Sequence, residues 1–264
     1  MQFVQSLYRH PVKGFTPERR ESLVVGPDGR VVGDRVLALR FADAATPEDR
    51  DGLDHWPKSR GLALVDFPSL ARLHVAYDEE PGRLRVADEA DVLAEDVLDE
   101  AGRERISEAV AAWVLDGPDA RRLRGEGRLP LRLVGDGATA RFQDRPRGFV
   151  SLHAAASVAA LDAAVDAPVD DRRFRSNIVI GGTDAWAELS WAGGVTIGAV
   201  AFRVQGPIGR CLAIHANPDT GERDAGLLRI LTREFAQAEP TLGILLLPEA
   251  AGGEIRVGDP VRLG

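Results

Sequence analysis

The chain has 264 residues, a formal net charge of −8 at pH 7, 44% apolar side chains and 28% charged side chains. This composition is ordinary for a soluble globular protein, and the length allows one large β-rich domain or two smaller ones. The negative charge argues against a broad nucleic-acid-binding surface, so an anion site must be a local cluster of cations. The single cysteine excludes an internal disulfide framework and a zinc site with several thiolates.

Targeting and membrane signals are not recognised in the sequence. The first residues lack the basic segment and long apolar run of a signal peptide, and no stretch approaches the ~20 apolar residues of a membrane helix. We therefore expect a cytoplasmic protein that does not enter a membrane. Its basic residues are almost all arginine, with Lys13 and Lys58 as the only lysines. A lysine retained in such a chain hints that its compact ammonium group matters.

The first part of the sequence predicts short strands joined by Pro/Gly turns. Apolar alternation places strands at residues 3–8, 22–25, 36–41, 70–77 and 83–86, the last two as a hairpin. Residues 86–102 are rich in Asp and Glu and are expected to be a solvated segment without chemistry. A helix is predicted over 103–115 because its apolar residues share one face. The charged stretch 116–129 predicts a boundary between a domain of residues 1–117 and a domain of residues 118–264.

The second part continues the strand pattern and adds short helices. Residues 131–134, 149–152, 175–180, 199–204 and 211–216 are predicted strands, and 158–165 and 224–235 are predicted helices. Residues 135–140 fit the G-x-G-x-x-A form of a dinucleotide-binding loop, but no helical pattern follows, so this motif is rejected. Asn217-Pro218-Asp219-Thr220-Gly221 predicts a turn.

Cys211 follows Arg210 directly at the predicted strand-turn-strand corner. A neighbouring guanidinium favours the thiolate, which is the form that attacks an electrophile or binds a metal. The alternative is ordinary, since a lone free cysteine is most often a small buried hydrophobe. The sequence alone leaves both roles open.

Five short stretches carry a resemblance to a known family. Gly209-Arg210-Cys211 and Pro218-Asp219-Thr220-Gly221 resemble the signature of the MOSC domain, found in molybdenum-cofactor sulfurases and in the amidoxime-reducing component, although Ile208 and Asn217 depart from it. The segment from Phe174 to Gly182 is similar to that family's Phe-Arg-Pro-Asn-Ile-Val stretch. Pro-Val-Lys ending at Lys13, and Gly-Asp-Arg ending at Arg35, resemble the β-barrel domain that precedes MOSC in the amidoxime-reducing group.

The resemblance implies a mainly β protein, with an N-terminal β-barrel-like domain, a MOSC β-barrel and few helices. It also implies a molybdenum-cofactor (molybdopterin) site between them. Lys13, Arg35 and Arg175 would hold the cofactor phosphate, and Cys211 would bind the metal and be the catalytic residue. The other cofactor-binding residues would be Asn177, Gly209 and Arg210. Because Arg175 and Asn177 lie two apart on a predicted strand, we expect them on the same side. Ser151 and Ser157 are both candidates for a further contact.

The implied activity is reduction of small N-hydroxylated compounds. Because no flavin, haem or iron–sulfur motif is found, a separate electron-transfer protein or reductase would supply the electrons. One alternative is a sulfur carrier or sulfurtransferase that works through a Cys211 persulfide. Another is a molybdopterin-binding protein without enzymatic activity.

Overall fold

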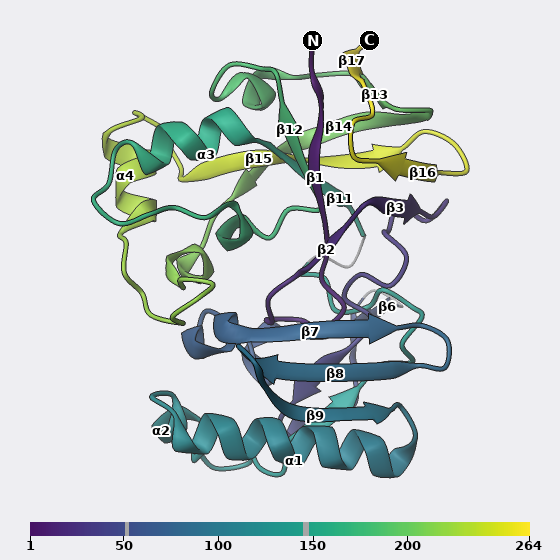
Figure 1. The fold of residues 1–264 in the computed structure, drawn as a ribbon, viewed down its shortest axis with the longest axis vertical. Coiled ribbons are helices and arrows are strands. Elements are labelled where there is room, and N and C mark those ends of the chain that lie inside the picture. The colour runs from purple at the N-terminus through teal and green to yellow at the C-terminus, as the bar shows by residue number, and fades with distance from the viewer. Residues whose placement is uncertain (51–52, 145–147) are drawn as a thin grey trace.

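The computed structural model describes residues 1–50, 53–144 and 148–264, and consists of two layers with the chain passing repeatedly between them (Figure 1). The predicted mainly β fold with few helices is confirmed. Within the described residues, no helix is both long enough and apolar enough to cross a bilayer.

The upper layer in Figure 1 is built on a mixed sheet of eight strands, counted over the described residues. Their order is β17 (Val261–Leu263), β13 (Gly194–Ile197), β14 (Val200–Gly209), β15 (Thr241–Pro248), β11 (Val150–Ala154), β12 (Ile178–Gly181), β1 (Phe3–Arg9) and β2 (Glu18–Arg20). Only β11 and β12 run parallel among these pairs. Buried residues of β1, β11–β15 and β17 form one core together with those of β3 (Ser22–Val25) and β16 (Gly253–Arg256). A sheet that curls around its own interior forms a single core of this kind.

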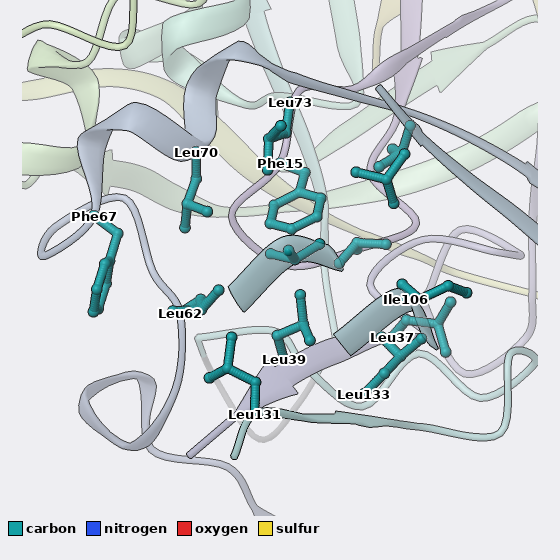
Figure 2. Close-up of a cluster of buried hydrophobic side chains, with 14 of the residues drawn as sticks. Phe15, Leu37, Leu39, Leu62, Phe67, Leu70, Leu73, Ile106, Leu131 and Leu133 are labelled. Atoms are coloured by element: carbon teal, nitrogen blue, oxygen red, sulfur yellow. The ribbon is translucent and has the colours of Figure 1, made fainter. Parts of the chain in front are cut away.

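The lower layer contains the three-stranded sheet β7 (Leu73–Asp78), β8 (Arg83–Asp88) and β9 (Asp91–Val97), with helix α1 (Glu100–Asp116) beneath it (Figure 1). The strand β4 (Ala38–Arg40) pairs with β10 (Arg132–Val134), and α2 (Ala120–Leu123) follows α1. Figure 2 shows the core between these elements, which includes Phe15, Phe67, Ile106 and Leu133.

The acidic residues of segment 86–102 are exposed or half-buried, so the expected solvation is present, but the segment also has regular secondary structure. It forms the edge strand β9 and the start of α1, where the Asp99 side chain accepts a hydrogen bond from the Gly102 amide at 2.7 Å. An edge strand leaves one side in water, so its carboxylates can remain solvated while the backbone pairs with β8.

The predicted division at residues 117/118 does not separate the two cores. Leu131 and Leu133, beyond that point, pack with the N-terminal residues of the lower core. In the other direction, Val4 and Leu7 of β1 pack in the upper core. These long-range pairings leave no local signal in composition, because each strand involved is only three to seven residues long.

Three short elements flank the upper sheet. They are α3 (Ala155–Asp162), α4 (Leu227–Arg233) and the 3₁₀ helix η6 (Leu212–His215). The last corrects the strand predicted over 211–216. The predicted turn after it is present: the Asn217 side chain accepts from the amides of Asp219 (2.8 Å) and Thr220 (3.2 Å), and Gly221 has a φ of 71°.

Candidate functional site

A cavity of about 260 Å³ contains six of the seven residues that the sequence singled out. Its lining includes Lys13, Arg35, Arg175, Gly209, Arg210 and Cys211. They come from the turn after β1, from the loop before β4, from the loop before β12 and from the end of β14. The fold, and not local sequence, therefore brings the cations and the thiol together, and the predicted convergence of Lys13, Arg35 and Arg175 is present.

Arg35 and Arg175 share an unusual backbone conformation. Both have a φ of 53°, in the left-handed region that side chains other than glycine rarely adopt. Arg175 lies between the 3₁₀ helix η4 (Asp171–Phe174) and β12, so it is not on a strand, and the expectation that it shares a strand face with Asn177 was wrong. Such a conformation costs about 1–2 kcal/mol per residue, and outliers of this kind gather at functional sites.

The side chains of both arginines donate hydrogen bonds to backbone carbonyls. The Arg35 Nη2 donates to the Arg175 carbonyl at 3.1 Å, and the Arg175 Nη1 donates to the Phe15 carbonyl at 2.6 Å. Burial first, and then the charge of Arg35, lower the pKa of Arg175 to about 9. An anion bound between them would relieve this repulsion.

Asp34 is the buried counter-ion of Arg35. It is fully buried, forms an ion pair with Arg35 and accepts a hydrogen bond from the His10 amide at 2.7 Å. Burial alone would raise the pKa of Asp34, but Arg35 and the His10 hydrogen bonds outweigh it and hold the pKa well below its usual range. The His10 ring is buried too, and burial followed by the charges of Arg35 and Arg175 lowers its pKa to about 3. Asp34 is thus an anion that orients Arg35.

Asn177 does not reach the cavity, which corrects its predicted contact with the cofactor. It is fully buried, and its Oδ1 accepts from the Ser151 amide and hydroxyl at 3.2 and 2.9 Å. Its Nδ2 donates to the Tyr8 carbonyl and to Asp34, both at 3.2 Å. The amide is therefore used up in joining β1, β11 and the Asp34 loop. Of the two serines, Ser151 lines the cavity, whereas Ser157 is buried and bonded to Glu188.

Cys211 is exposed and sits just after β14, where η6 begins. The Arg210 guanidinium points away from solvent: it donates to the Leu242 carbonyl and, at 2.8 Å, to the Phe174 carbonyl, and it lies 5.6 Å from the centre of the Phe174 ring. Burial lowers the pKa of Arg210 to about 9, although the neighbouring Cys211 opposes this. Arg210 therefore anchors the corner that displays the thiol. Leu245 on β15 also lines the cavity.

Sequence reasoning missed Lys58, Asp144 and Arg173, which also line the cavity. The lining now contains six cations within the described residues: Lys13, Arg35, Lys58, Arg173, Arg175 and Arg210. Three have carboxylate partners, in the pairs Lys13–Asp144 (2.7 Å), Arg35–Asp34 and Arg173–Asp224 (2.8 Å). The other three have none within ion-pair distance among the described residues. The bias toward arginine was the one signal for Lys58, since both lysines of the chain meet here.

The C-terminal part of the chain matches a known protein family. Residues 140–262 match the MOSC domain family. The matched residues supply Arg175, Gly209, Arg210 and Cys211 to the cavity, while Lys13, Arg35 and Lys58 come from outside them.

Curated relatives of the MOSC domain include proteins named molybdenum cofactor sulfurase. The chain is 46% identical over 68 residues to the one from Drosophila ananassae and 35% identical over 75 residues to the one from Bos taurus, which is 25% and 28% of this chain. It spans only 9% and 8% of those two relatives. These matches relate a part of this chain to a small part of proteins that are named for the molybdenum cofactor.

Among solved structures, the YuaD protein from Bacillus subtilis is similar over 99% of this chain and 94% of its own, with 11% identity and a TM-score of 0.41. The YiiM protein from Geobacillus stearothermophilus is similar over 44% of this chain and 53% of its own, with 16% identity and a TM-score of 0.33.

Proposed function

We propose that the cavity binds the molybdenum cofactor and that the protein reduces N-hydroxylated compounds with electrons from a separate donor protein. The observation that carries the proposal is the meeting of an exposed thiol with a cluster of cations in one cavity. The chemical character of these groups fits the cofactor, because a thiolate suits molybdenum and the cations suit a phosphate.

Each residue then has a defined task. Lys13, Arg35 and Arg175 would hold the phosphate, and Asp34 would keep Arg35 oriented. Cys211 would bind the metal, and Arg210 and Gly209 would fix the corner that presents it. When bound, the cofactor would supply the oxygen-atom and two-electron chemistry. The apolar lining near the thiol, with Ile208, Phe174 and Leu245, would keep water from the substrate.

A sulfur carrier is the second candidate, because the thiol is exposed and the curated relatives are named molybdenum cofactor sulfurases. In that case Cys211 would carry sulfane sulfur as a persulfide. A third candidate, cofactor binding without catalysis, rests on the same cation cluster.

Reduction of benzamidoxime by the cofactor-loaded chain, with a chemical electron donor, tests the proposal. We expect turnover in the natural chain and none in Cys211→Ser. The sulfur carrier predicts instead no turnover, and one added sulfur on the Cys211 peptide by mass spectrometry after incubation with a sulfur donor. Neither activity, with the cofactor bound, would leave the binding protein.

A further inference from the structure

Lys58 lies in a cavity-lining loop that packs against Arg40. It begins the 3₁₀ helix η2 (Lys58–Arg60) directly after Pro57, whose carbonyl accepts from Arg40 at 2.6 Å. The Arg40 guanidinium in turn lies 5.4 Å from the ring centre of the buried Trp56. The Lys58 ammonium itself makes no hydrogen bond or ion pair with a described residue, although it lines the cavity. The loop is thus packed against the core, and no described residue lies within ion-pair distance of the Lys58 ammonium.

Asp144 is the one carboxylate among the described residues that line this cavity. Its Oδ1 accepts from the Lys13 Nζ at 2.7 Å, and Lys13 also donates to the Phe142 carbonyl at 3.1 Å. The Asp144 side chain is largely exposed, so its partial loss of hydration, which would raise its pKa, is outweighed by the charges of Lys13, then Lys58 and Arg35, and the pKa is lowered. Three cations from three separate loops therefore act on a single carboxylate.

The Lys13–Asp144 pair is asymmetric. The Lys13 side chain is 12% exposed, whereas that of Asp144 is 63% exposed. Burial lowers the pKa of Lys13, and Asp144 opposes that shift. A buried ammonium needs an anion beside it, whereas an exposed carboxylate can return to water at little cost. Another anion can therefore replace Asp144.

We propose that Lys13 and Lys58 form an anion subsite that Asp144 occupies in the empty protein and that a phosphate or carboxylate group of the ligand takes over. The identity of that ligand rests on the proposed function. A phosphate brings more charge and more acceptor oxygens than Asp144, so it can engage both ammonium groups at once. The bound anion displaces the Asp144 carboxylate from Lys13, and Lys58 adds affinity for that anion.

Titration of the full chain with inorganic phosphate tests this. The protein is made in a host that lacks the cofactor, and binding is followed by calorimetry at fixed pH and ionic strength. We expect Asp144→Asn to tighten phosphate binding about three-fold or more, because it removes the competing carboxylate. We expect Lys58→Gln to weaken it about three-fold.

The ion pair of Arg60 with Asp43 provides matched controls. Arg60, in the same 3₁₀ helix as Lys58, pairs with Asp43 at 3.2 Å, and neither residue lines the cavity. Asp43→Asn and Arg60→Gln change the net charge just as the two test variants do. If Asp144→Asn binds phosphate no more tightly than Asp43→Asn, or Lys58→Gln no more weakly than Arg60→Gln, the subsite does not exist.

The cofactor-loaded protein distinguishes the two sources of the anion. If the cofactor phosphate takes the subsite, Lys58→Gln should lower the molybdenum content per chain. If a substrate takes it, Lys58→Gln should raise the KM of a carboxylated amidoxime and leave that of a neutral amidoxime unchanged. If Lys58→Gln changes neither the molybdenum content nor the KM of the carboxylated amidoxime, the replacement of Asp144 by a ligand is refuted. A chain that never acquires molybdenum would refute the proposed function, while the phosphate titration would still decide the subsite.

Discussion

Asp34→Asn tests how the cation cluster is built, because the substitution keeps the shape of the side chain and removes its charge. The natural Asp34 is fully buried, pairs with Arg35 and accepts from the His10 amide at 2.7 Å. Breaking a buried ion pair by removing one partner costs about 3–5 kcal/mol. The Arg35 side chain keeps 17% of its surface exposed, so water can partly compensate, and we expect about 3 kcal/mol. For a chain of this size that is a fall in Tm of about 6–12 °C.

The assay is urea unfolding at several pH values, with Asp54→Asn as the control. Asp54 pairs with Arg141 at 2.9 Å, but both side chains are more than 40% exposed, so its loss should cost less than about 1 kcal/mol. The pKa of Asp34 is lowered on folding. Its contribution should therefore be complete above the unfolded pKa of about 3.9 and should decline as the pH falls below it toward the folded pKa. A cost for Asp34→Asn no larger than that for Asp54→Asn at pH 7 would refute the role of Asp34 as the buried counter-ion.

Two further predictions concern stability. Burial first, and then neighbouring arginines, lower the pKa of His10 and that of His153 to about 3. As the pH falls below about 6.5, only the unfolded chain therefore binds protons at these two side chains. The free energy of unfolding should fall by about 2 kcal/mol between pH 6 and pH 5. Urea titrations check this, and His153→Phe should halve the loss; an unchanged slope would contradict the assignment. Arg210→Lys should cost about 2 kcal/mol and make Cys211 react at a different rate with a thiol reagent, because an ammonium lacks the planar fork with which the guanidinium reaches the carbonyls of both Leu242 and Phe174. Natural stability and thiol reactivity in that variant would show that Arg210 does not anchor the corner.

Much of the fold could be predicted from periodicity. The strands β1, β3, β7 and β8 and the helix α1 appear where alternation and the helical face place them. The domain boundary could not be predicted, because β1 pairs with β12 and β10 pairs with β4 across the expected division. The acidic strand β9 was missed because its charges mask a pairing that the backbone alone makes.

The candidate site was predictable residue by residue only where a motif marked it. Family resemblance singled out Lys13, Arg35, Arg175 and Cys211, and the structure brings them to one cavity. It also suggested Asn177, but hydrogen bonding inside the protein uses both ends of that amide, which a sequence does not reveal. Asp144 was missed, since its importance comes from the two lysines that the fold places around it.

The molybdenum and pterin content of the purified chain tests the central claim most directly. The protein is made in a molybdenum-replete host that synthesises the cofactor, and metal and pterin are measured per folded chain. We predict about one molybdenum and one pterin per natural chain, and loss of metal with most of the pterin kept in Cys211→Ser, because the phosphate contacts lie elsewhere. A folded natural chain without molybdenum or pterin under these conditions would contradict the account.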